Sequence, residues 1–133
     1  MKHLFILLFF ILHVTVCFSQ IKFSSVTHDL GTFSEDTVHL PAFHFEYVNE
    51  GKQPVHISHI KTSCGCIQAS TDSQPVKPGK KGIIRVTYNP DGHPGAFNRS
   101  ITVYFSNIKK PYILYIKGYV RPKEKRMFLN TSF

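Results

Sequence analysis

The stretch IRVTYNPDGHPGAFNRSITVYF, which runs from Ile84 to Phe105, holds two runs of period two on either side of a turn. Apolar and polar residues alternate in Ile84–Tyr88 and again in Ile101–Phe105. Successive side chains of a strand point to opposite faces, so this alternation is typical of a strand that buries one face. The intervening Asn89–Gly95 is rich in proline and glycine, which is typical of a loop. The stretch therefore predicts two β-strands joined by a loop.

The same pattern recurs along most of the chain. Short apolar or alternating runs occupy residues 21–26, 43–47, 55–60 and 114–120, and turn residues separate them. Almost no helical spacing follows residue 19. About six or seven short strands divided by polar turns predict an all-β fold, and an antiparallel sandwich rather than a βαβ fold.

One run changes its phase. Val55 and Ile57 alternate with polar residues, but the next apolar residue is Ile60 rather than residue 59. A shift by one position indicates an extra residue in the strand, so we expect a β-bulge around Ser58–His59.

The inward-facing positions of these runs define a predicted core. Its members are Phe43, Phe45, Val55, Ile57, Ile84, Val86, Tyr88, Ile101, Val103, Phe105, Leu114 and Ile116. Full burial of such a side chain contributes roughly 1.5–3 kcal/mol, so this core does not require a cross-link. The chain has no tryptophan, and Cys64 and Cys66 are too close in sequence to bridge two sheets about 10 Å apart. The hallmark tryptophan and inter-sheet disulfide of antibody domains are therefore missing.

The N-terminus has the pattern of a secretory signal peptide. Lys2 precedes the apolar run Leu4–Cys17, and small side chains at Cys17 and Ser19 suit cleavage after residue 19. The run is short for a membrane span, which needs about 20 apolar residues. An uncleaved anchor, or lipidation of Cys17 despite the unfavourable Val16 before it, is the alternative.

The chain is thus divided into a signal peptide (1–19), a sandwich domain (20–120) and a basic C-terminal tail (121–133) that is expected to fray. Cleavage removes Lys2 and no acidic residue, so the net charge changes from +8 to +7. A basic exported domain suggests an envelope protein or an anionic polysaccharide as partner. No nucleic-acid-binding motif is present, and membrane contact is expected only through the signal segment before cleavage.

Six stretches in a fixed order carry a family resemblance. They are HDLGTFSED (28–36), FEYVNEGKQPVHI (45–57), SCGCI (63–67), VKPGKKGIIRVTYNP (76–90), PGAFNRSITVYFSN (94–107) and LYIKGYV (114–120). Together they resemble domain-of-unknown-function family 1573, a secreted bacterial family similar to the immunoglobulin-like domains of the major-sperm-protein and cilia-associated type. Leu30 replaces the usual aromatic residue and Ile67 the usual threonine, and neither change affects the expected fold. The resemblance implies a seven-stranded antiparallel immunoglobulin-like β-sandwich in the periplasm or on the surface of a Gram-negative bacterium.

No enzyme motif is present. The eight Asp and Glu residues form no recognisable acid–base frame. No serine lies in a nucleophile elbow, and no glycine-rich phosphate loop opens a helix. We therefore predict no catalytic residues and a non-enzymatic protein, and the resemblance assigns no activity either.

The segment from His56 to Cys66 suggests a metal site. His56, His59, Cys64 and Cys66 follow the spacing H-x2-H-x4-C-x-C. Residues 56 and 59 of a regular strand point to opposite faces, so only the predicted bulge brings the two imidazoles together. Soft thiolates beside an imidazole suit Cu(I) better than zinc, whose paired cysteines usually have two to four residues between them. Two ordinary surface histidines are the alternative.

Cys64 and Cys66 are also the only cysteines after the signal peptide, and an oxidising exterior favours a disulfide between them. Such a small ring requires a tight bend, which we expect Gly65 to permit because it has no Cβ. The ring would be strained and easily reduced. The pair is accordingly a local turn staple or two semi-buried side chains, a redox-active dithiol, or a point of thiol attachment or metal binding.

Strand parity predicts an exposed aromatic surface. If Val103 and Leu114 face inward on paired strands, the side chains of Tyr104, Tyr115, Lys117 and Tyr119 face outward. Such a set suits a partner surface, although cross-strand aromatic pairing is an alternative explanation. The sequence thus predicts a secreted cell-envelope module with a binding or structural role. The alternative is a thiol redox or copper-handling protein that uses the Cys-Gly-Cys motif.

Overall fold

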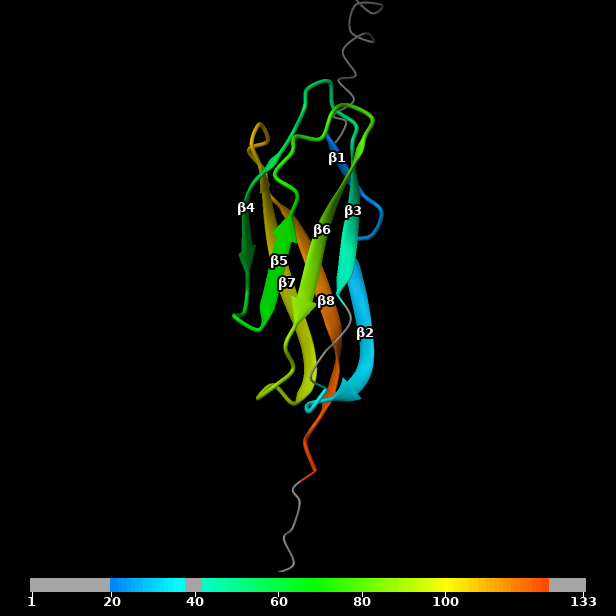
Figure 1. Cartoon of the computed structure of the whole chain (residues 1–133), viewed down its shortest axis with the longest axis vertical. Coiled ribbons are helices and arrows are strands. Elements are labelled where there is room, and N and C mark those ends of the chain that lie inside the picture. Colours follow the sequence, from blue (N-terminus) through cyan, green and yellow to red (C-terminus); the bar gives the residue numbers. More distant parts are fainter. Residues whose placement is uncertain (1–19, 38–41, 125–133) are drawn as a thin grey trace, which may run out of the picture.

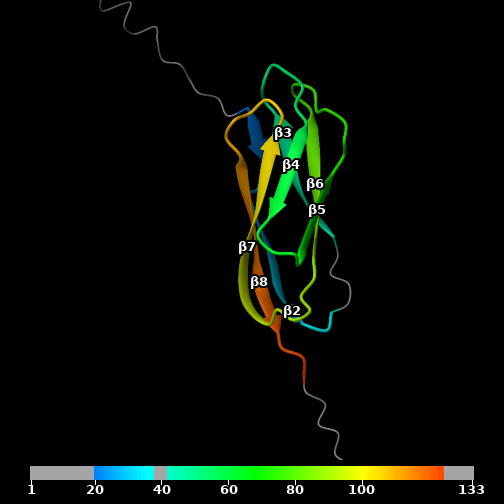
Figure 2. The same cartoon turned by 90° about the vertical axis from the view of Figure 1, so that its left-hand side faces the viewer.

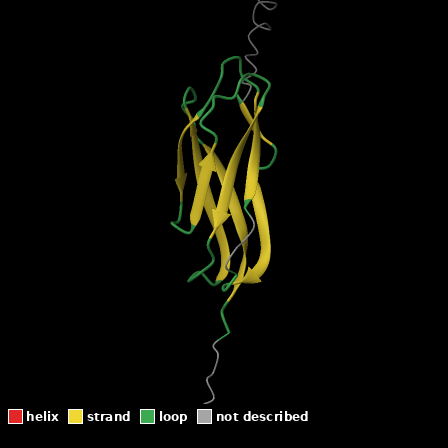
Figure 3. Ribbon diagram, in the orientation of Figure 1, coloured by secondary structure: helices red, strands yellow, loops and turns green. Residues whose placement is uncertain are grey.

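The protein folds into two β-sheets that pack face to face (Figure 1). The structure is a computed structural model that describes residues 20–37 and 42–124. Within these ranges the secondary structure consists of β-strands alone (Figure 3). They are β1 (Ile21–Phe23), β2 (Thr27–Ser34), β3 (Phe43–Asn49), β4 (Ile57–Thr62), β5 (Ile67–Thr71), β6 (Lys81–Tyr88), β7 (Gly95–Phe105) and β8 (Tyr112–Arg121).

The order of the strands is that of an immunoglobulin domain with one addition. One sheet has the order β1-β3-β6-β5 and the other β2-β8-β7-β4. Immunoglobulin domains place strands A, B, E and D in one sheet and C, F and G in the other. The first sheet here matches A-B-E-D, and β4, β7 and β8 match C, F and G. The added strand β2 runs parallel to β8 and covers its free edge.

The predicted all-β sandwich is confirmed, but the count of seven strands is wrong, since eight lie in the described part of the chain. The period-two pattern misses β2 and β5. Strand β2 lies at a sheet edge, and its register with β8 shifts between Asp29 and Thr32, so its burial does not alternate regularly. The predicted signal peptide, residues 1–19, lies outside the described residues.

The register and the core follow the sequence pattern closely. The pairing of β4 with β7 shifts between Ile57 and His59, which confirms the predicted bulge. Eleven of the twelve predicted core residues are buried, and Ile57 is partly buried against them. The core also includes Ile21, Tyr47, Cys66, Ile67, Phe97 and Val120. The described residues contain no helix that is long and apolar enough to cross a membrane.

The connections between the sheets place distant segments at one end of the sandwich. In Figures 1 and 2 the β6–β7 loop lies at the lower end, near the ends of β2 and β8, and the β4–β5 turn lies above it in the lower half. Both connections cross from one sheet to the other. This topology brings the Cys-Gly-Cys motif close to the loop Asn89–Pro94.

Candidate functional site

A disulfide joins Cys64 and Cys66 within the β4–β5 turn, with their Cα atoms 5.2 Å apart. The turn is closed by the Ile67 amide, which donates to the Cys64 carbonyl oxygen at 3.2 Å. The Cys66 amide also donates to the Cys64 Sγ at 3.0 Å. The expected role of Gly65 is wrong, because its φ is not positive and a Cβ built there meets no atom within 4 Å. The bend therefore does not depend on the missing side chain.

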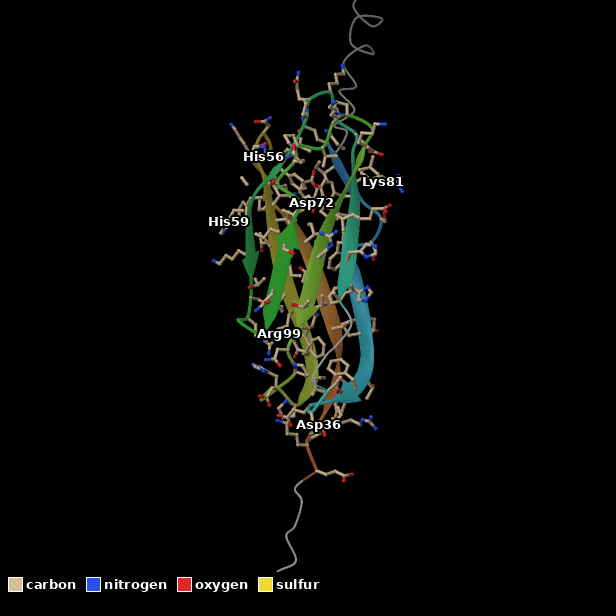
Figure 4. All side chains as sticks on the ribbon, in the orientation of Figure 1. Asp36, His56, His59, Asp72, Lys81 and Arg99 are labelled. Carbon is tan, nitrogen blue, oxygen red and sulfur yellow. A yellow bond between two sulfur atoms is a disulfide. The ribbon has the colours of Figure 1, made fainter. Side chains whose placement is uncertain are left out.

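The imidazole that approaches this pair is that of His93, in the β6–β7 loop. One ligand atom from each of Cys64, Cys66 and His93 lies within 4.8 Å of the other two. The predicted ligands His56 and His59 lie elsewhere, higher in Figure 4, with His59 on β4 and His56 just before it. The ring centroid of His59 is 5.8 Å from that of Tyr104 on the outer face. The His56 carbonyl accepts from the Ser106 amide, beyond the end of β4 opposite to the cysteines.

The loop that carries His93 is held by side chains from two other elements. Both carboxylate oxygens of Glu35 are used, accepting from the Gly92 amide at 2.9 Å and from the Lys123 amide at 3.0 Å. The Lys123 ammonium in turn donates to the Asp91 carboxylate. This contact lowers the pKa of Asp91 and raises the pKa of Lys123, first through the hydrogen bond and also through the opposite charges.

These contacts change the expectation for the C-terminal tail. The tail was expected to fray from residue 121, yet β8 includes Arg121, and Lys123 is bound by Glu35 and Asp91. Residues 125–133 lie outside the described residues. The beginning of the tail thus belongs to this end of the sandwich.

An open pocket of about 630 Å³ lies beside the disulfide. Its lining includes Cys66, Tyr88, Glu35, Asp91 and Lys123. The Tyr88 hydroxyl is buried and has no hydrogen-bond partner among the described residues. Burial raises the pKa of Tyr88, while the positive charge of Arg99 acts in the opposite direction. An unpaired buried hydroxyl costs about 1–3 kcal/mol, so this position favours a polar atom from solvent or from a ligand.

Arg99 extends this polar region from the opposite sheet. The Ser63 amide donates to the Ser100 carbonyl oxygen, and the Ser100 amide donates to the Ser63 Oγ, both at 3.0 Å. Arg99 therefore adjoins the cysteine turn, toward the lower end of the molecule in Figure 4. Its Nε is buried without a hydrogen-bond partner within residues 20–37 and 42–124. The positive charge of Arg99 thus acts on Tyr88, which lines the same pocket as Cys66.

The second candidate region is the outer face of the β2-β8-β7-β4 sheet. As predicted, Tyr104, Tyr115 and Tyr119 are exposed there, by 36%, 38% and 46% of their surface. Lys117 lies between the last two along β8 and pairs with Asp29 of β2 at 3.7 Å. Ile113 is the other large apolar residue exposed on β8.

Cross-strand aromatic pairing explains Tyr104, which lies opposite His59 of β4, but not Tyr115 and Tyr119. Tyr115 lies opposite Ser100 of β7, and Tyr119 lies opposite Ala96. Among the described residues, Tyr104 has a ring contact with His59, and Tyr115 and Tyr119 have no aromatic partner on the neighbouring strands. Their exposed rings therefore remain accessible to another molecule.

Sequence reasoning missed the residues that surround the cysteines. His93, Glu35, Asp91 and Lys123 come from three segments that only the fold brings together. The sequence identifies NPDGHPG as a loop between two strands. Its histidine, His93, is the one signal there that could have indicated a metal-binding site. The missing information was that this loop and the β4–β5 turn lie at the same end of the sandwich.

Comparison with known proteins identifies a family and a shared fold. The family described as "Protein of unknown function (DUF1573)" matches residues 21–120. No curated protein matches the chain. A crystal structure of a protein of unknown function from Porphyromonas gingivalis W83 is similar, with a TM-score of 0.62 and 15% identity. The match covers 80% of this chain and 51% of that one, so this chain spans about half the length of that protein.

Two further solved structures are similar to the chain. The VesB protease of Vibrio cholerae has a TM-score of 0.57 and 12% identity, with 77% of this chain and 32% of that chain covered. WR4, a C. elegans MSP family member, has a TM-score of 0.49 and 11% identity, with 77% of this chain and 99% of that chain covered. The likeness to the Porphyromonas and Vibrio proteins shows the fold.

Proposed function

Because the chain belongs to the DUF1573 family, whose function is unknown, we propose its role from its own surface: it is an exported, non-enzymatic immunoglobulin-like module of the cell envelope. In this role the outer face of the β2-β8-β7-β4 sheet binds an acidic surface of a partner protein. The observation that carries the proposal is the concentration of exposed large apolar side chains on this one sheet. They are Tyr104 of β7 and Ile113, Tyr115 and Tyr119 of β8.

The contrast between the two outer faces supports this assignment. The outer face of the β1-β3-β6-β5 sheet carries ion pairs, in which Lys81 contacts Glu46 at 2.8 Å and Arg85 contacts Asp72 at 3.3 Å. The aromatic face also has an ion pair, that of Lys117 with Asp29. The difference therefore lies in the exposed large apolar side chains, of which none in the described part of the chain lies on β1, β3, β5 or β6. Aromatic side chains are enriched in protein interfaces, and a patch of exposed apolar residues marks an interaction site.

The composition of the aromatic face favours a protein over a polysaccharide. Tyrosines suit both partners, but the aliphatic side chain of Ile113 gains most from apolar groups of another protein. The net charge of +8 on the whole chain favours an acidic partner surface. Lys61 adds positive charge to the same sheet, whereas Lys117 is paired with Asp29.

Export is supported by two independent features. The apolar segment predicted as a signal peptide precedes the sandwich, and a disulfide is typical of proteins outside the cytoplasm. The envelope of a Gram-negative bacterium is the compartment that fits both features.

The proposal is tested by photo-crosslinking in the producing bacterium. A photoreactive phenylalanine analogue is placed at Tyr115 and, as the matched control on the opposite face, at Arg85. We expect a discrete protein adduct from position 115 that is missing from position 85. Adducts of equal yield from both faces, or adducts that contain polysaccharide alone, would contradict the proposal.

The identified partner then permits a quantitative measurement. Replacement of a tyrosine at the centre of an interface costs about 2 kcal/mol or more, which corresponds to a roughly 30-fold weaker complex. We expect such a loss for Tyr115→Ala with Tyr119→Ala in a titration of the purified proteins. Lys81→Ala with Arg85→Ala, on the other face, should leave the affinity unchanged.

A further inference from the structure

We propose that the reduced protein binds one Cu(I) ion through the thiolates of Cys64 and Cys66 and the imidazole of His93. The three ligand atoms already lie within 4.8 Å of one another. They come from two connections that the topology places at one end of the sandwich. This site is separate from the outer face proposed to bind a protein, so a failure of one proposal does not affect the other.

The kind and number of ligands select Cu(I). Soft thiolate ligands favour Cu(I), zinc and iron–sulfur clusters among the metals common in proteins. Structural zinc sites are almost always four-coordinate, whereas the described residues supply two sulfur atoms and one nitrogen here. Two thiolates and one imidazole form a three-coordinate set that matches a soft monovalent ion.

A hydrogen bond from one ring nitrogen of His93 leaves the other nitrogen available to bind a metal. The His93 Nδ1 lies 2.7 Å from the Asp91 carbonyl oxygen. A carbonyl oxygen only accepts, so Nδ1 carries the proton of the neutral ring and Nε2 keeps a free lone pair. Metal-binding histidines commonly donate their second ring N–H to a backbone carbonyl or a carboxylate, and this contact fixes tautomer and orientation.

The loop that carries His93 is fixed before any metal arrives. The His93 amide donates to the Pro90 carbonyl oxygen at 3.0 Å, and the Asn89 amide donates to the Cys66 carbonyl oxygen at 2.8 Å. Glu35 binds the Gly92 amide from the end of β2. The loop is therefore tied both to the cysteine turn and to the neighbouring strand, which lowers the entropic cost of assembling the ligands.

The surroundings suit the charge of the complex. Two thiolates and one Cu(I) ion carry a net charge of −1. Arg99 adjoins the cysteine turn, and its buried Nε lacks a hydrogen-bond partner among the described residues. The Cys66 amide donates to the Cys64 Sγ and so stabilises negative charge on that sulfur. This amide donor thus favours the thiolate form that the metal requires.

Metal binding and the disulfide exclude each other. A dithiol reductant, such as a thioredoxin-like protein or dithiothreitol, supplies two electrons and two protons and itself becomes a disulfide. Cys64 and Cys66 are then free thiols, and binding of Cu(I) releases both thiol protons. The oxidised protein holds no such site, so the redox state of the pair controls whether copper is bound.

The proposal is tested by competition with a chromophoric Cu(I) chelator under anaerobic conditions. The purified protein from residue 20 onward, which holds every proposed ligand, is reduced with dithiothreitol and freed of it before the titration. We expect one equivalent of Cu(I) per chain in the reduced protein and none in the oxidised protein. X-ray absorption of the loaded protein should show two sulfur ligands and one nitrogen ligand.

Variants identify the ligands. His93→Ala should weaken binding at least about 10-fold, because even the outer partners of metal ligands are worth about 10–100-fold. His59→Ala removes an exposed imidazole from β4 and should leave the affinity unchanged. Cys64→Ser and Cys66→Ser should each abolish stoichiometric binding, and circular dichroism checks that each variant is folded.

Several results would overturn the assignment. Equal binding by the oxidised protein would show that the thiolates are not the ligands. An unchanged affinity in His93→Ala would remove the histidine from the site. Binding of Zn²⁺ with no binding of Cu(I) would show that the choice of metal is wrong.

Discussion

The ring of Tyr47 lies over Gly82, its direct partner in the antiparallel β3–β6 pair, and fills the space that a side chain at residue 82 would need. Tyr47 is 2% exposed and packs edge-on against Phe105 of the other sheet at 5.2 Å between ring centroids. The ring cannot move aside without disturbing this contact between the sheets. We therefore expect Gly82→Ala to lower the free energy of unfolding by about 1–3 kcal/mol, the usual cost of overpacking a core.

Urea denaturation measures this effect, and Gly65→Ala is the matched control. A Cβ at residue 65 meets no atom within 4 Å, and the backbone there is not left-handed. The control should therefore stay within about 0.5 kcal/mol of the wild type. Equal losses in the two variants would mean that the space around the glycine does not decide the effect.

Asn49 is a buried polar residue whose side chain holds the turn after β3. Its Nδ2 donates to the carbonyl oxygens of Gln53 and Val76 at 2.7 and 2.9 Å, and its Oδ1 accepts from the Gly51 amide at 2.9 Å. Asn49→Ala removes all three bonds and leaves buried partners unpaired. We expect a loss of about 2–4 kcal/mol, since each net bond is worth about 1 kcal/mol and an orphaned partner costs more.

Thermal and urea unfolding of Asn49→Ala provide the measurement. Asn98→Ala is the control, because Asn98 is exposed on β7. A loss below about 0.5 kcal/mol in Asn49→Ala would contradict the role assigned to its hydrogen bonds, since that is the range of ordinary surface substitutions.

The disulfide should contribute little to stability. Cys64 and Cys66 close a very short loop, and the stabilisation from restricting the unfolded chain is smaller for shorter loops. The double variant Cys64→Ala, Cys66→Ala should therefore remain folded and lose about 1–2 kcal/mol, part of it from the buried Cys66 side chain.

The measurement compares urea unfolding of this double variant with that of the wild type, with and without dithiothreitol. Reduction should change the wild type by a similar amount and leave the variant unaffected. A variant that does not fold would show that the core depends on this cross-link.

The ion pair between Lys81 and Glu46 should make stability depend on pH. The hydrogen bond from Lys81, and then its positive charge, lower the pKa of Glu46 below its usual 4.5. A lowered pKa in the folded protein means that the contribution is complete above about pH 4.5 and is lost as the pH falls through the folded value. Both groups are exposed, so the effect should be small and should weaken with added salt.

Urea unfolding between pH 7 and pH 3 tests this dependence in Lys81→Met. The difference from the wild type should be constant near neutral pH and should shrink on acidification below 4.5. Lys80→Met, which removes the neighbouring exposed lysine, should give a difference that varies less with pH. A difference for Lys81→Met that grows as the pH falls would have the wrong sign for this ion pair.

The sequence by itself determined the fold class and most of the core. In β6 and β7 each strand buries one face against the opposite sheet, so hydrophobic alternation reports directly which side chains point inward. The same alternation revealed the bulge after Ile57, because one extra residue shifts every later side chain. It also placed Tyr104, Tyr115 and Tyr119 on the outer face.

Only the tertiary structure decided which strands pair and which side chains meet. Strand β2 is defined by its parallel contact with β8, far away in sequence, and its own residues alternate too weakly to reveal it. His93 reaches Cys64 and Cys66 because two connections between the sheets lie at the same end of the sandwich. Local sequence patterns report the environment of one segment, whereas a site built from several segments depends on how their chains cross in space.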